Sequence, residues 1–114
     1  MRRHLLTLLI AASLAACASN PPVQQDPETY TRGRSLYLAG EHERAFPLIF
    51  EAASNGHPEA QYAIGYMFYL GQGVDQNAAE GIEWMRRAAK AGEPRAIEAL
   101  SLLAGSRAPA QPGE

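Results

Sequence analysis

The chain has little cysteine, little histidine and no long hydrophobic run. Its single cysteine, Cys17, excludes an internal disulfide, and its three histidines form no HxxxH or HExxH pair of the kind that binds zinc. The longest mostly apolar run, residues 5–16, is shorter than the roughly 20 residues that cross a membrane. An internal disulfide, a metal site and an ordinary transmembrane helix are therefore not expected.

Basic residues are also few and scattered. The chain has 10 Lys and Arg against 12 Asp and Glu, a net charge of −2. Removal of residues 1–16 would take away two arginines and bring the net charge to near −4, with only Arg86 and Arg87 adjacent among the remaining basic residues. Nucleic-acid binding requires a basic face, so nucleic acid is not an expected partner.

The N-terminal segment has the features of a secretory signal. The short positive region MRRH precedes the apolar run, which ends in Leu14-Ala15-Ala16-Cys17. This ending resembles the bacterial lipoprotein signal, in which a small residue precedes a cysteine that is lipidated. The resemblance implies a signal peptide over residues 1–16 and an acylated Cys17. Ala18 in place of Asp then implies a membrane anchor on the periplasmic side of the outer membrane. The alternative is an ordinary secreted protein cut at the A-x-A site of residues 16–18.

Two polar segments border the region with helical periodicity. Residues 17–26 carry the cysteine and a polar stretch with Pro21-Pro22, which predicts a flexible tether. Residues 106–114, SRAPAQPGE, are predicted to be a disordered tail. The domain is therefore expected to span residues 27–105.

Start and stop signals predict five helices in this domain. The first runs from Pro27 to about residue 39, with Asp26 as its N-cap, and the second covers about residues 42–54. Pro47 predicts that the second helix either starts late or bends. The third runs from about 58 to 70, Asn77-Ala78-Ala79-Glu80 resembles a capping box that opens the fourth, and Pro94 starts the fifth. In the fifth helix one face is apolar: Ala96, Ile97, Leu100, Leu103 and Ala104.

The chain also contains an internal repeat. AASNGHPEA at residues 52–60 recurs as AAKAGEPRA at residues 88–96, 36 residues later, and Gly33 recurs as Gly65, 32 residues later. Small residues at these two glycine positions allow a paired helix to approach closely. A repeat of this length is one helix-turn-helix unit. We therefore predict an all-α fold, a short α-solenoid of about two repeats with a C-terminal capping helix.

Residues 60–96 resemble a Sel-one-like repeat, a close relative of the tetratricopeptide repeat. The motif comprises Gly65, the glycine-rich loop Gly71-Gln72-Gly73, Trp84 and the sequence AAKAG at residues 88–92. Residues 26–57 are more like a plain tetratricopeptide repeat. Gly81 stands where the family usually has Ala, and is expected to loosen the helix pair by up to about 1 kcal/mol. The resemblance implies an adaptor or scaffold without cofactor or catalysis, in which self-association could cover an open end.

All five tyrosines lie on the first helices of the pairs, at helical spacing. In related repeats the first helices line the concave face. Tyrosine suits a half-wet groove, and Tyr and Arg are typical of binding hot spots. Tyr62 and Tyr69 could instead pack between repeats, whereas Trp84 is expected in the core. We predict a groove for a peptide or helix of another envelope protein, with these partner-binding residues: Tyr30, Arg34, Tyr37, Tyr62, Tyr66, Tyr69, Arg95 and Glu98.

Alternatives to the adaptor remain open. Some cysteine-rich relatives of this repeat family are linked to β-lactam binding, which suggests a cell-wall enzyme, but this chain lacks their paired cysteines. A structural or toxin-neutralising lipoprotein is a further possibility. His57, in a Gly-His-Pro sequence, is interpreted as a polar turn residue.

Overall fold

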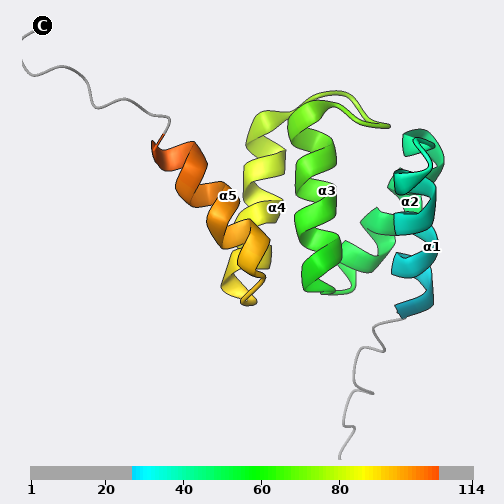
Figure 1. The fold of residues 1–114 in the computed structure, drawn as a ribbon, viewed down its shortest axis with the longest axis horizontal. Coiled ribbons are helices and arrows are strands. Elements are labelled where there is room, and N and C mark those ends of the chain that lie inside the picture. Colours follow the sequence, from blue (N-terminus) through cyan, green and yellow to red (C-terminus); the bar gives the residue numbers. More distant parts are fainter. Residues whose placement is uncertain (1–26, 106–114) are drawn as a thin grey trace, which may run out of the picture.

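The computed structural model describes residues 27–105, which form five α-helices and no strand (Figure 1). The helices follow one another across the molecule in chain order, and each packs chiefly against the next. The fold class is thus the predicted all-α solenoid, with two helix pairs and a fifth helix. The helices are α1 (Pro27–Leu38), α2 (His42–Ser54), α3 (Pro58–Leu70), α4 (Ala78–Lys90) and α5 (Pro94–Gly105).

Local sequence signals set most of the helix ends. Pro58 occupies the first turn of α3, where a missing N–H costs nothing, and Gly71 ends α3 in the left-handed conformation with φ of 74°. The Asn77 side chain caps α4 by accepting from the backbone N–H of Glu80 at 3.1 Å. The reciprocal half of the predicted capping box is absent, because the Glu80 carboxylate accepts from the Trp84 indole N–H instead, at 3.0 Å.

The structure excludes a late start for α2. The helix begins at His42, so it does not start late, and Pro47 lies inside it. Proline has no N–H to donate to the carbonyl of Glu43, four residues earlier. The burial of Ala45, Ile49 and Ala52 on one face compensates for that loss.

Glycines bring the helices of each pair into close contact. A Cβ at Gly33 would lie 2.8 Å from Cγ1 of Ile49, so α1 and α2 pack closely only because Gly33 has no side chain. In the second pair, a Cβ at Gly65 would lie 2.7 Å from the carbonyl oxygen of Gly81, and a Cβ at Gly81 2.5 Å from that of Gly65. The expectation that Gly81 loosens this pair is therefore wrong. Its low helix propensity is outweighed because an alanine would collide with backbone.

The core runs continuously through both pairs. Its largest fully buried side chains are Ile49, Ile64, Met67 and Met85, and Trp84 is buried as predicted. Two edge-to-face ring contacts join the pairs. Phe46 meets Phe68 at 5.4 Å between ring centroids, and Phe50 meets Trp84 at 5.8 Å. The two repeats thus share one core.

The connection between α3 and α4, residues 71–77, lies against the first pair. Gly73, with φ of 70°, touches the carbonyl of His42 at the start of α2 so closely that a side chain has no room. The Tyr37 hydroxyl of α1 donates to the Gln72 side-chain oxygen at 2.8 Å. This loop therefore packs against the turn of the first repeat and holds the two repeats together.

The fifth helix buries less of its apolar face than predicted. Of the five residues expected on that face, only Ala96 is fully buried, Leu100 and Leu103 are half-buried, and Ile97 is 50% exposed. The reason is that α5 packs chiefly against one neighbour, α4.

Several predictions concern segments outside the described residues. They are the signal peptide of residues 1–16, the lipidated Cys17 with its tether to residue 26, the Asp26 cap and the tail of residues 106–114.

Candidate functional site: the groove between α1 and α3

A groove lies between the first helices of the two pairs. Its volume is about 240 Å³, and α1 and α3 supply most of its lining, with Ile49 of α2 and Arg95 of α5 supplying the rest. Six of the eight residues predicted to bind a partner line it together, and these are Tyr30, Arg34, Tyr37, Tyr62, Tyr66 and Arg95. We call this cavity the tyrosine groove.

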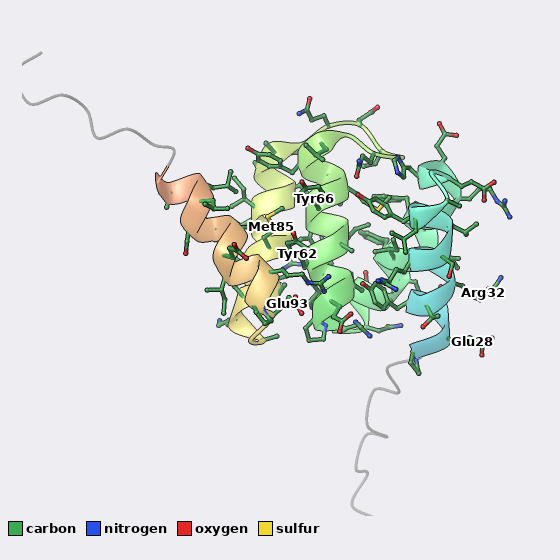
Figure 2. All side chains as sticks on the ribbon, in the orientation of Figure 1. Glu28, Arg32, Tyr62, Tyr66, Met85 and Glu93 are labelled. Carbon is green, nitrogen blue, oxygen red and sulfur yellow. The ribbon has the colours of Figure 1, made fainter. Side chains whose placement is uncertain are left out.

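The helical spacing explains why these side chains converge. Tyr30, Arg34 and Tyr37 follow one face of α1 at intervals of four and three residues. Tyr62 and Tyr66 are one turn apart on α3, with their rings 6.0 Å apart (Figure 2). The spacing is visible in the sequence, whereas the meeting of the two faces depends on the packing of α1 and α3 around α2.

The four groove tyrosines differ in burial and in whether their hydroxyls are hydrogen-bonded within the fold. Tyr30 is only 7% exposed, and its ring packs against that of His57 in a tilted arrangement, with 4.5 Å between centroids. Tyr37 contacts His42 and donates its hydroxyl to Gln72. The hydroxyls of Tyr62 and Tyr66 make no hydrogen bond to another described residue. Tyr30 and Tyr37 therefore shape the groove, and Tyr62 and Tyr66 offer it free hydroxyls.

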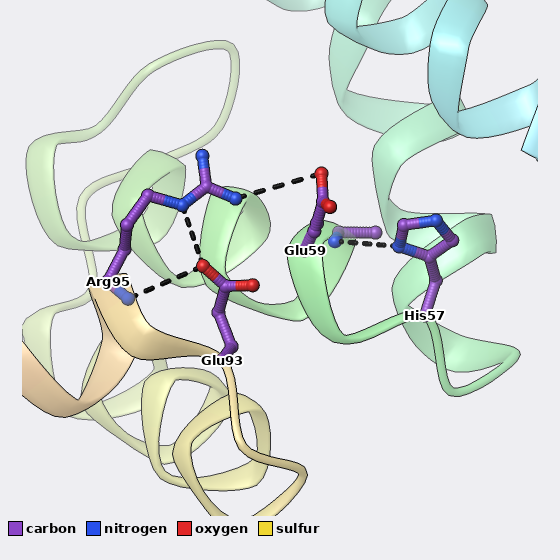
Figure 3. A network of polar contacts seen from close by, with 5 residues as sticks. His57, Glu59, Glu93 and Arg95 are labelled. Atoms are coloured by element: carbon purple, nitrogen blue, oxygen red, sulfur yellow. Dashed lines mark hydrogen bonds and ion pairs between the residues drawn. The ribbon is translucent and has the colours of Figure 1, made fainter.

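Two carboxylates hold the guanidinium of Arg95 in place (Figure 3). Its Nε lies 2.6 Å from Oε1 of Glu93, a residue of the α4–α5 turn that is 8% exposed, and its Nη2 lies 3.7 Å from Oε2 of Glu59. The guanidinium also lies over the Tyr62 ring, 5.0 Å from its centroid. Arg95 thus ties α5 to α3, and its charge is already balanced within the fold.

The contacts and burial of the groove residues also shift the pKa values of Arg95, Tyr30 and Tyr62. The hydrogen bond to Glu93 is the main cause that raises the pKa of Arg95, so this guanidinium stays charged. Burial raises the pKa of Tyr30 and, from a more open position, that of Tyr62. Both phenols are therefore neutral at ordinary pH, and each presents a hydroxyl rather than an anion.

Two predicted site residues lie outside the groove lining. Tyr69 is half-buried at the α3–α4 contact, where its backbone N and Cβ lie against Gly81. This is the packing position that the sequence left open for it. Glu98 is exposed on α5 and does not line the cavity. The predicted role of these two residues in binding stays a prediction, because register along a helix does not give the crossing of neighbouring helices.

The sequence also missed residues that build the site. Leu38 and Ala63 complete the lining, and Leu38 is 67% exposed there. His57 is more than a polar turn residue, because its Nδ1 accepts from the backbone N–H of Ala60 at 3.2 Å and caps α3. The only sequence feature that could have pointed to Glu93 is that it is a carboxylate two residues before Arg95.

The chemistry of the groove favours binding. Aromatic faces, two free hydroxyls and the guanidinium of Arg34 suit a ligand with apolar and anionic groups. Within residues 27–105 no cluster of three or more His, Cys, Asp or Glu side chains is arranged to hold a metal ion. None of the five described helices is long and apolar enough to cross a membrane.

The paired helices and their shared core define a helical-repeat protein of the α-solenoid type. The Sel1 repeat family matches residues 58–93, which span α3, the glycine-rich loop and α4. This match supports the resemblance to Sel1-like repeat proteins.

Two curated fungal proteins are similar to this chain over 71 residues. Chitin synthase regulator SKT5 of Saccharomyces cerevisiae is 32% identical, over 62% of this chain and 10% of its own length. Chitin synthase regulatory factor 3 of Schizosaccharomyces pombe is 37% identical, over 62% of this chain and 8% of its own length. The chain thus spans about a tenth or less of these relatives. No solved structure matches the chain.

Proposed function

We propose that this chain is a protein–protein interaction module, without chemistry of its own, that binds a peptide segment of another protein in the tyrosine groove. The convergence of six Tyr and Arg side chains in one cavity carries the proposal. Tyrosine contributes a large contact area at low entropic cost, and Tyr and Arg together dominate many interfaces. The Sel1 repeat match and the two relatives named as regulators support a role in binding proteins.

Site-specific photo-crosslinking tests this function. A photoreactive phenylalanine is placed at Leu38 or Tyr66, both exposed groove residues, and at Glu83, an exposed residue of α4 outside the groove. Irradiation of living cells is expected to give discrete adducts from Leu38 and Tyr66 and none of the same mass from Glu83. Equal adduct patterns at all three positions, or none at the groove positions, would contradict a binding site in the groove.

We further propose that the module is held in a bacterial envelope by acylation of Cys17, at the outer membrane. The signal-like residues 1–16 and their ending in Ala16-Cys17 support this proposal. Several acyl chains, each stabilised by about 0.8 kcal/mol per buried CH₂, make a stable anchor.

Metabolic labelling with radioactive palmitate tests the anchor. The wild-type chain is expected to take up label and to sediment with outer membranes, whereas Cys17→Ser is expected to remain unlabelled. An unlabelled wild-type chain would show that the anchor is absent, and would leave the groove experiment unaffected.

A further inference from the structure

The two arginines of the tyrosine groove have different roles. Arg95 is neutralised by Glu93 and Glu59 and joins three elements of the fold. Arg34, on the exposed side of α1, makes no ion pair with another described residue. A partner would therefore find one free positive charge in the groove, at Arg34.

The lining of the groove is electrostatically unlike the chain as a whole. Both of its charged side chains are arginines, although the net charge of the chain is −2. A carboxylate on a partner would meet the free guanidinium of Arg34 without a competing acidic side chain in the lining. A cationic partner would meet the like charge of Arg34 and no carboxylate in the lining.

The free hydroxyls of the groove favour an extended partner over a helical one. Tyr62 and Tyr66 each offer an O–H donor with no acceptor among the described residues. The carbonyls of an α-helix are already used by its own backbone, whereas a polyproline II segment has no internal hydrogen bonds and presents its carbonyls. Aromatic grooves also suit proline-containing segments, which are preformed and lose little entropy on binding.

The size of the groove is consistent with one part of a longer ligand. Its volume of about 240 Å³ is below the roughly 300–1,000 Å³ of pockets that enclose drug-sized molecules. It therefore takes a few side chains of a segment whose remainder lies along α1 and α3.

We infer that the tyrosine groove selects an extended, proline-containing peptide segment that carries a carboxylate, with Arg34 as the residue that selects the charge. This inference rests on the proposed function and specifies its partner. Arg34 contacts the carboxylate, Tyr62 and Tyr66 donate to backbone carbonyls, and Arg95 only positions Tyr62.

Four fluorescent peptides test the inference against the full chain in a mild detergent. Three are extended, namely APPLPELPPA and its counterparts with Gln or Lys in place of Glu. The fourth presents the same leucines and glutamate on a stapled helix of equal length. Binding is measured by fluorescence anisotropy. The Glu peptide is expected to bind about five- to tenfold more tightly than the Gln peptide, as for one charge-assisted hydrogen bond at a partly exposed site.

Two variants of α1 locate the effect. Arg34→Gln is expected to bring the Glu and Gln peptides to equal affinity. Arg32→Gln is the matched control, because Arg32 is also exposed on α1 but lies on its outer side, away from α3 (Figure 2). The Arg32→Gln variant is expected to keep the preference for the Glu peptide over the Gln peptide. Circular dichroism confirms that both variants are folded.

The possible outcomes separate this inference from the proposed function. Equal affinity of the Glu and Gln peptides for the wild-type chain, tighter binding of the helix, or no binding of any peptide would each overturn the inference. So would a preference that survives Arg34→Gln. In these cases groove-specific crosslinking at Leu38 and Tyr66 would still uphold the interaction module, and its absence would overturn both.

Discussion

The two helix pairs achieve the same close packing with different atoms. In the first pair, Gly33 faces the side chain of Ile49 on a neighbouring helix. In the second pair, Gly65 and Gly81 face each other, so the contact is between two backbones. Side chains can shift to accommodate a small change, whereas helix backbones must move together. The second pair therefore has less room for a side chain at its helix contact, and it is the pair matched by the Sel1 repeat.

The loops within the two pairs also differ, and again the second pair has the more extensive contacts. Three residues join α1 to α2, and seven join α3 to α4. The longer loop makes contacts of its own, through Gly73 at His42 and Gln72 at Tyr37. The additional residues thus bind the second repeat to the first.

The largest predicted effect concerns the facing glycines. Gly81→Ala is expected to lower the free energy of unfolding by about 2–3 kcal/mol, because overpacking against the Gly65 carbonyl outweighs the gain in helix propensity. Gly33→Ala is expected to cost less, about 1–2 kcal/mol, because the nearest backbone atom to its Cβ, the nitrogen of Ile49, lies at 3.1 Å, whereas a Cβ at Gly81 meets backbone at 2.5 Å. Urea denaturation followed by circular dichroism measures both. Gly105→Ala, with open space around its Cβ, is the control. A more stable Gly81→Ala variant would restore the expectation from helix propensity.

A second comparison concerns the glycines of the two connections. Gly40 and Gly73 both have positive φ, of 80° and 70°, but only Gly73 lies against backbone. Gly40→Ala is expected to cost about 1 kcal/mol, the price of the left-handed conformation alone. Gly73→Ala is expected to cost about 2 kcal/mol, because the loop must also leave His42. Thermal melts compare the two variants. Equal losses of stability would argue that the contact of Gly73 with His42 does not stabilise the fold.

The helix starts offer a third, smaller contrast. Asn77 caps α4 with its side chain, whereas Glu41 makes no side-chain cap at α2. Asn77→Ala is expected to cost about 1 kcal/mol, and Asn77→Ser to retain most of the stability. Glu41→Ala is expected to change stability by less than about 0.5 kcal/mol, because its ion pair with Arg44 is exposed. Equilibrium unfolding in urea checks all three, and a Glu41→Ala loss as large as that of Asn77→Ala would contradict the contrast.

The smallest expected effect appears at high pH. Burial raises the pKa of Tyr30 above the usual value of 10.0, so the folded chain keeps a proton that the unfolded chain loses first. The stabilisation is complete below about pH 10 and is lost as the pH rises through the raised pKa. Tyr30→Phe is expected to flatten the fall in melting temperature above about pH 10. Tyr62→Phe should flatten it less, because Tyr62 is less buried. Identical curves for all three proteins would contradict this origin.

Sequence patterns were sufficient for the elements and for most of the groove. Proline and asparagine at helix starts, glycine after helix ends and the 36-residue repeat placed the helices within a residue or two, because these signals act locally. The tyrosine spacing on α1 and α3 predicted the faces that line the cavity. The proposed role of these residues in binding stays a prediction until a partner is captured.

The sequence failed where the outcome depends on how helices cross. Gly81 is a poor helix former by propensity, and only its position opposite Gly65 makes it necessary. Tyr69 shares the stripe of Tyr62 and Tyr66, and the sequence could not decide between the groove and the α4 contact, where the structure places it. The Glu93–Arg95 pair is short-range in sequence, yet its importance comes from the burial of Glu93 in the α4–α5 turn. Predicting each of these cases requires distances between helices, which the periodicity of the sequence does not contain.

The glycine loop also limits how this array of repeats can grow during evolution. Gly73 and Gln72 contact the turn of the preceding pair directly, so a unit inserted between the two pairs would separate them from His42 and Tyr37. At the other end, α5 packs chiefly against α4 and leaves Ile97 and Leu102 half or more exposed, so a further unit could stack there without breaking a contact. Duplication is thus expected to lengthen such a protein after α5, while the joined first two pairs are inherited as one block.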